Sequence, residues 1–342
     1  MEVTASAREL YDAAVVIDAL GGSIIRRPPP PVDGKDVLDQ RLAGGITVSN
    51  ETLASDAESF RDAITAIYYY LTLAKVESDR VRIIERVDDI DLVKREGKHG
   101  LILGFQGATA FEDDIATVFI FQKLGIRITG LAYNRRTAVG DGCYEAEDQG
   151  LTVHGRRLVY ALNEAGITID LSHVGRRTAL EATEVSEAPV VYSHSNCAAL
   201  TPHIRNVTDE QIRAMAAKGG VIGIGPHSVF CEATPGVRPT FAEFMAHVRH
   251  VIDLVGVDHV GIGTDMFGGE TIGERVFRAH FSRVVPRFFG GYSIAEKYVE
   301  GFGSPFDFPK LADGLRDMGL SDEDVLKVLG GNFVRVFSAT WK

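Results

Sequence analysis

The chain has 342 residues and a net charge of −11, with 45% hydrophobic and 24% charged residues. This is the composition of a globular protein, and the negative charge argues against nucleic acid or an anionic membrane as the main partner. The longest apolar runs are strand-sized, which is too short to span a bilayer. Residues 1–14 lack the apolar core of a signal peptide, and three cysteines suggest no disulfide framework. We therefore expect a cytoplasmic protein.

Short β-branched runs alternate with helical patterns along the whole chain, which is typical of parallel βαβ units. Several runs are apolar on both faces, as in a sheet covered by helices. No G-x-G-x-x-G motif follows the first run, which disfavours a Rossmann sheet, and eight units favour a closed (β/α)8 barrel. We expect one barrel domain over residues 1–342. Its strands are predicted near residues 14–20, 46–50, 101–106, 126–133, 167–172, 189–194, 220–225 and 258–265.

Two segments interrupt this alternation. Four consecutive prolines follow the first predicted strand and exclude a helix at residues 28–31. We interpret them as a rigid surface connection, with a lid or a subunit contact as the alternative. The Gly- and aromatic-rich insertion at residues 267–310 follows the last predicted strand, so it either covers the pocket or forms a long loop.

Helix signals punctuate the second half of the chain. Thr208 precedes two acidic residues and an amphipathic run, which predicts a helix N-terminus. Residues 241–256 show helical spacing of apolar positions and end in glycine. Ser321 is the cap candidate of a closing helix pair over residues 321–337.

Three polar side chains stand at the ends of predicted strands. His173 ends G-I-T-I-D-L-S-H, His194 ends P-V-V-Y-S-H, and Asp265 ends H-V-G-I-G-T-D. The carboxyl ends of barrel strands meet at one rim, so these side chains are expected to lie close together. Two imidazoles suit a metal ion, and a carboxylate beside them suits proton transfer. Taken alone, Asp265 is equally well explained as a helix cap.

Ordered motifs over nearly the whole chain resemble the membrane (renal) dipeptidase family of zinc metallopeptidases, which have amidohydrolase-like barrels. The motifs are G-L-T-V-H-G-R-R-L-V, G-I-T-I-D-L-S-H, V-Y-S-H-S-N, R-N-V-T-D-E-Q-I, G-G-V-I-G-I, D-H-V-G-I-G-T-D and L-G-G-N-F-V-R-V-F. The resemblance implies a homodimer and a small substrate that bears a carboxylate.

The resemblance also implies roles for individual residues. His173 and His194 match the two ligands of one zinc ion, and Asp265 matches the catalytic aspartate. Arg205 matches the arginine that pairs with the substrate carboxylate, and a guanidinium fork suits that partner. Two residues at the end of the fourth predicted strand match a position that contacts the substrate, namely Tyr133 and Asn134.

The chain departs from the family at the second metal ion. The family's first strand ends in Asp-Gly-His-x-Asp, whereas here Leu20 and Gly22 stand at the His and the last Asp. Gln106 stands at the bridging glutamate and offers one good oxygen and no charge. We therefore expect at most one divalent metal, zinc, held by His173 and His194 with help from Gln106, Asp265 or water.

These features predict a metal-dependent hydrolase that cleaves an amide bond in a small dipeptide-like or N-acyl amino acid substrate. A lyase or hydratase acting on a small carboxylate-bearing metabolite is the first alternative, and a non-catalytic family member is the second. Cys143 lies after the fourth predicted strand and is either a ligand, a nucleophile or a small buried residue. His227 lies on the rim after the seventh predicted strand, with no role assigned.

Overall fold

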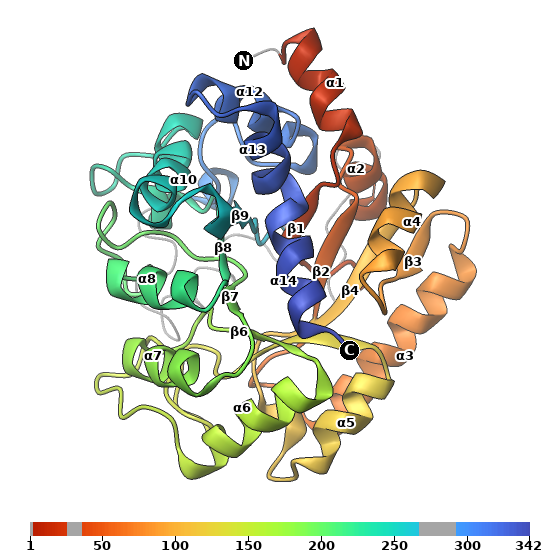
Figure 1. Ribbon diagram of the computed structural model, residues 1–342, viewed down its shortest axis with the longest axis vertical. Helices are drawn as coiled ribbons and strands as arrows, with labels where there is room; N and C mark the ends of the chain where they lie inside the picture. Colours follow the sequence, from red (N-terminus) through yellow and green to blue (C-terminus); the bar gives the residue numbers. More distant parts are fainter. Residues whose placement is uncertain (1–2, 26–35, 267–291) are drawn as a thin grey trace.

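The computed structural model describes residues 3–25, 36–266 and 292–342. Eight parallel strands form a nearly closed barrel in the order β1-β2-β4-β5-β6-β7-β8-β9, and the short strand β3 pairs with β4 outside this ring (Figure 1). The strands are β1 Ile17–Gly22, β2 Val48–Ala54, β3 Val81–Ile83, β4 His99–Phe105, β5 Ile126–Gly130, β6 Thr168–Asp170, β7 Val190–Tyr192, β8 Val221–Ile224 and β9 Val260–Ile262.

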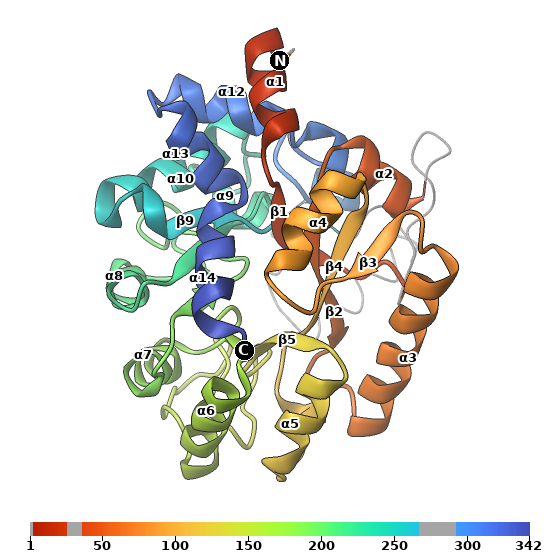
Figure 2. The ribbon, with the colours of Figure 1, turned by 45° about the vertical axis from the view of Figure 1, so that its right-hand side comes forward.

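Helices between the strands cover the outside of the barrel, which buries both faces of the sheet (Figure 2). They are α1 Ala5–Ala13, α2 Val37–Ala43, α3 Phe60–Val76, α4 Asp88–Glu96, α5 Ala116–Lys123, α6 Val153–Ala165, α7 Arg176–Val185, α8 Asp209–Ala217, α9 Ser228–Cys231, α10 Phe241–Val255, α12 Lys310–Asp317, α13 Asp322–Leu326 and α14 Asn332–Thr340. Within the described ranges, no helix combines the length and the apolar character needed to cross a bilayer.

The seam between the last strand and the first is closed just beyond β9. The carboxylate of Asp18 accepts hydrogen bonds from the backbone N–H of Thr264 at 2.8 Å and from its hydroxyl at 2.6 Å. The N–H of Asp265 donates to the carbonyl of Leu20 at 2.7 Å. These bonds join residues about 245 positions apart and place Asp265 directly above the end of β1.

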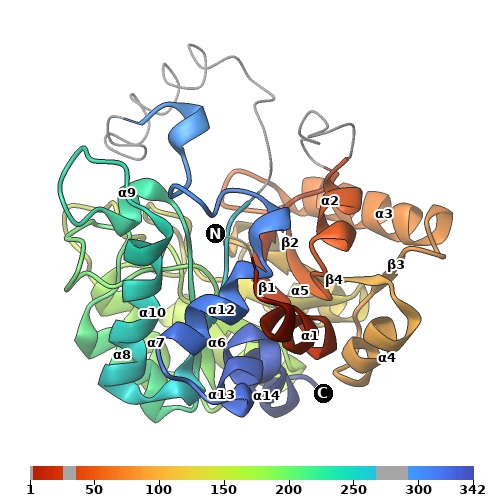
Figure 3. The same cartoon turned by 90° about the horizontal axis from the view of Figure 1, so that it is seen from above.

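The two ends of the barrel differ. Helix α14 closes the amino-terminal end, where Phe333 and Phe337 share a buried cluster with Ile17, Val48 and Val191. The carboxyl ends of the strands form the opposite end, which we call the mouth. Figure 3 shows α14 and α9 at these opposite ends of the barrel. The polar strand-end residues therefore lie at the mouth, as expected for a barrel of this type.

The structure confirms the barrel and its eight predicted strands, with ends that differ by a few residues. Strand β3 was not predicted, because three residues are too short to show a period. The side chains of Thr208 and Ser321 cap α8 and α13 as expected. A π-helical turn over Lys327–Gly331 separates α13 from α14 in the closing pair.

Both interrupting segments are described only in part. The proline run at residues 28–31 lies outside the described residues, and so do residues 267–291 of the insertion. The rest of the insertion is described, and Tyr298 pairs with His227 in an antiparallel bridge next to the mouth. Whether residues 1–342 form one domain, and whether the insertion covers a pocket, stay predictions.

Candidate active site

His173 and His194 come together at the mouth from β6 and β7, as predicted. Both side chains are buried, and their Nε2 atoms lie 2.9 Å apart. The ring of Tyr133 stacks on the ring of His173 with centroids 4.0 Å apart. This packing holds the imidazole in one orientation.

Hydrogen bonds to the other ring nitrogens fix where the protons lie. Nδ1 of His173 donates to the side-chain oxygen of Asn134 at 2.7 Å. The hydroxyl of Ser193 donates its single hydrogen to Asp170, so its oxygen accepts from Nδ1 of His194 at 2.7 Å. Both Nε2 atoms then carry lone pairs, as the neutral imidazole of a metal ligand does.

The surroundings keep both rings neutral. Burial lowers the pKa of His194 to about 4, and the nearby charge of Arg205 adds to this effect. Burial, Arg205 and His194 together hold the pKa of His173 well below its ordinary value. At neutral pH two lone pairs therefore face each other across 2.9 Å. This arrangement is repulsive unless a cation lies between them.

His173 and His194 offer two ligands for one metal ion, whereas the positions expected to hold a second ion lack them. The described residues contain no group of three or more His, Cys, Asp or Glu side chains that could hold a metal. Leu20 and Gly22 lack ligating atoms. Gln106, the third ligand expected from the sequence, has a side chain that is 8% exposed.

Gln106 is held in place by its amide nitrogen and leaves its oxygen unused. Nε2 donates to the hydroxyl of Thr52 at 2.7 Å. The oxygen is buried and accepts no hydrogen bond from any described residue. A buried acceptor without a partner costs free energy, which is why such groups mark binding sites. Ligation of a metal ion by this oxygen stays a prediction.

Asp265 lies at the mouth as predicted, beside two basic side chains. Nε2 of His227 lies 3.3 Å from one of its carboxylate oxygens. Burial raises the pKa of Asp265, but His227, His194 and Lys297 outweigh it and leave the pKa below its ordinary value. Asp265 is therefore ionised at neutral pH and able to accept a proton. No sequence pattern marks Lys297 as a site residue, since it lies within the irregular insertion.

Arg205 lies next to His194, and part of its guanidinium has no hydrogen-bond partner among the described residues. Its Nη2 donates to the carbonyl of His194 at 3.2 Å, and its Cζ lies 5.6 Å from the ring centre of Phe230. The Nε–H is buried without a hydrogen-bond partner among the described residues. A buried cation with an unused donor is suited to an anionic ligand.

Asn134 and Cys143 support the histidines. The oxygen of Asn134 accepts from His173 and also from the thiol of Cys143, at 3.4 Å. Burial raises the pKa of Cys143 to about 11, so the thiol stays protonated and is a poor nucleophile at neutral pH. Direct contact of Tyr133 and Asn134 with a substrate stays a prediction.

Three site residues have a left-handed backbone. The φ angles of Asn134, His173 and Asp265 are +68°, +69° and +50°, and the only other described non-glycine residue with positive φ is Glu112. Such conformations cost about 1–3 kcal/mol each and gather at functional sites. A sequence pattern carries no sign of them.

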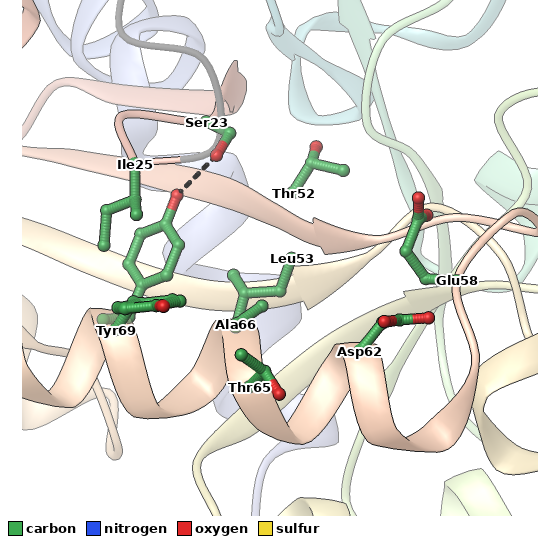
Figure 4. A pocket seen from close by; sticks show the side chains of 10 residues that line it. Ser23, Ile25, Thr52, Leu53, Glu58, Asp62, Thr65, Ala66 and Tyr69 are labelled. Carbon is green, nitrogen blue, oxygen red and sulfur yellow. Dashed lines mark hydrogen bonds between the residues drawn. The ribbon is translucent and has the colours of Figure 1, made fainter.

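A pocket of about 500 Å³ adjoins the mouth between the end of β2 and helix α3 (Figure 4). Thr52 lines it and also accepts the hydrogen bond from Gln106. The lining combines acidic and aromatic side chains and comprises Ser23, Ile25, Thr52, Leu53, Glu58, Asp62, Thr65, Ala66, Tyr69 and Tyr70.

Comparisons with known proteins identify the family of the chain. The chain is 32% identical to an amidohydrolase from Pseudomonas aeruginosa, with a TM-score of 0.86 over 98% of this chain and 99% of that one. It is 28% identical to the dipeptidases TcpJ of Claviceps purpurea and VerJ of Clonostachys rogersoniana over 81% and 82% of its length. It spans 60% and 66% of those two relatives. The pattern of the membrane dipeptidase family (peptidase family M19) matches residues 42–276, and the chain belongs to this family.

Proposed function

We propose that the chain hydrolyses the amide bond of a dipeptide or N-acyl amino acid that carries a free carboxylate, and that it uses one zinc ion. The facing lone pairs of His173 and His194, 2.9 Å apart beside an ionised Asp265, are the observation that carries the proposal. The names of the related dipeptidases and of the related amidohydrolase support the reaction class. Departures at Leu20 and Gly22 support one ion rather than two.

His173 and His194 would hold the ion, with the oxygen of Gln106 as a third ligand. Bound there, zinc would polarise the amide carbonyl and acidify a neighbouring water. Asp265 accepts a proton from that water while the water oxygen forms a bond to the carbonyl carbon of the amide. The C–N bond then breaks, and Asp265 returns the proton to the leaving amine.

Arg205 binds the carboxylate of the substrate. Its unused Nε–H and one Nη can donate in parallel to two carboxylate oxygens. This anchoring fixes the distance between the carboxylate and the amide, and so sets which bond meets the attacking water. The ring of Phe230 below the guanidinium keeps it in its plane.

We further propose that the protein is a cytoplasmic homodimer. The dimer follows from the family resemblance alone. For the cytoplasm, the support is that the three cysteines are free in the structure, Cys197 and Cys231 both being buried. Reduced, buried thiols suit a reducing compartment.

The test is a substrate panel with metal analysis. Zinc-loaded protein is assayed with dipeptides, with N-acyl amino acids, and with the same dipeptides blocked as C-terminal amides. We expect cleavage of the free acids, loss of activity with a chelator and recovery with zinc at one ion per chain. Arg205→Met should raise KM for the free acids by about 30-fold or more, since removing a partner of a buried charge pair costs ~2–5 kcal/mol.

Three results would contradict the proposal. A stoichiometry of two ions would refute the one-metal site. Equal cleavage of the acids and the blocked amides would refute the role of Arg205. If none of the panel is hydrolysed by zinc-loaded protein, the proposed reaction is wrong, and elimination or hydration of carboxylate-bearing metabolites becomes the function to assay.

A further inference from the structure

His227 is a buried titratable residue that the proposed mechanism leaves without a task. It follows β8 at the mouth and precedes helix α9, and its side chain is 3% exposed. Its ring stacks on Phe230, with centroids 5.3 Å apart, and meets the ring of Tyr298 edge-on at 5.1 Å. Two aromatic neighbours thus fix the plane of the imidazole.

The polar contacts of His227 are incomplete. Nε2 lies 3.3 Å from Oδ2 of Asp265, within ion-pair distance but without the alignment of a hydrogen bond. Neither ring nitrogen forms a hydrogen bond within the described part of the chain. Buried polar atoms in this state are rare and need an explanation.

Tyr298 links the backbones of Asp265 and His227. Tyr298 pairs with His227 in an antiparallel bridge, and its hydroxyl donates to the backbone carbonyl of Asp265 at 2.8 Å. The N–H of Val299 donates to the carbonyl of Pro226 at 2.9 Å. The ends of β8 and β9 are therefore tied by one described strip of the insertion.

We propose that His227 is a positioning residue for Asp265, whose carboxylate it holds through Nε2–H toward the reacting amide. The inference rests on the proposed function and adds a residue to it. Of the two carboxylate oxygens, Oδ2 would bond to His227 and Oδ1 would be left to accept the proton from water. When Asp265 is protonated, the contact with His227 keeps that proton on the side of the leaving amine.

The charges that face this pair come from several elements. Lys297 faces it from the strip that carries Tyr298, and Arg205 faces it from the loop beyond β7. His194, at the end of β7, also faces the pair but is neutral at pH 7. Burial lowers the pKa of His227, while Asp265 raises it. The imidazole is therefore neutral at pH 7, donates one proton to one acceptor, and does not repel the neighbouring cations.

The first experiment uses His227→Phe and His227→Gln in the zinc-loaded enzyme. Phenylalanine keeps the ring between Phe230 and Tyr298 but removes the donor, so kcat should fall about 10- to 100-fold, as for other supporting hydrogen bonds at metal sites, with KM unchanged. Glutamine places an N–H near the position of Nε2 and should restore most of kcat. His250→Phe is the matched control, because it removes a histidine–aspartate pair between α10 and α8.

The second experiment needs no activity. In zinc-free protein, NMR titration of the imidazole should show a lower pKa of His227 in Asp265→Asn, because the carboxylate that raises it has lost its charge. Asp209→Asn, which alters the partly exposed histidine–aspartate pair between α8 and α10, should leave the His227 titration unchanged. Wild-type kcat in His227→Phe, failure of glutamine to rescue, or an unchanged His227 titration would overturn the inference. Inactive wild-type protein on the whole panel would instead refute the proposed function, while the titration still tests the pairing.

Discussion

Asn134 offers the sharpest test of the proposed metal site, because its carboxamide fixes the proton of His173. Replacement by glycine removes the acceptor and tolerates the backbone φ of +68°. A supporting hydrogen bond of this kind is worth about 10- to 100-fold in metal affinity, or ~1.4–2.8 kcal/mol. Asn134→Gly should therefore raise the zinc Kd by that factor.

Asn134→Asp should act in the opposite direction. The side chain keeps its shape and accepts the same 2.7 Å bond, but a charged acceptor makes a stronger bond by ~1 kcal/mol, or about fivefold in Kd. Both variants are measured by competition with a chromophoric chelator at pH 7.5. Equal Kd values for wild type, glycine and aspartate would refute the assignment of His173 as a ligand oriented by Asn134.

Three other outcomes are expected. Gln106→Glu should tighten zinc binding in the same competition assay, because it adds a charge at a buried oxygen without a partner, and unchanged affinity would place Gln106 away from the ion. Glu51→Gln should lower the free energy of unfolding in urea by ~3–5 kcal/mol, because Arg41, 1% exposed, loses its charged partner. As a control, Asp39→Asn removes the more exposed pair with Arg80 and should cost under ~1 kcal/mol. Burial lowers the pKa of His99 to about 3, so the folded state resists a proton that the unfolded chain takes up near pH 6.5. Stability should therefore fall by up to ~1.4 kcal/mol per pH unit as the pH drops from about 6.5 toward 3, and His99→Gln should flatten this slope.

The sequence predicted the parts of the site that depend on strand order. His173, His194 and Asp265 end parallel strands, and the carboxyl ends of such strands share one rim whatever the loops do. The barrel itself followed from eight alternating units, since apolar strands of this length need helices on their outer face.

Residues outside the strands could not be placed in this way. Asn134 has a left-handed backbone conformation, and its side-chain oxygen accepts a hydrogen bond from His173. No residue pattern in the sequence predicts that conformation. Lys297 reaches Asp265 from an irregular segment more than thirty residues further along the chain. Asp170 and Ser193 lie within the strand motifs of the sequence. The hydrogen bonds that link Asp170 through Ser193 to His194, however, depend on the pairing of β6 with β7.

The hydrogen bonds between Asp18 and Thr264, which we call the clasp, close the barrel seam and imply an order of assembly. His173 and His194 lie on adjacent strands and need only local pairing to meet. Asp265 takes its position from Leu20 and from the clasp between Asp18 and Thr264, so it is set only when the last strand docks on the first. Contacts of such long range form late, because the intervening chain must be ordered first. A folding chain would thus bring the two proposed metal ligands together before it places the proposed proton acceptor.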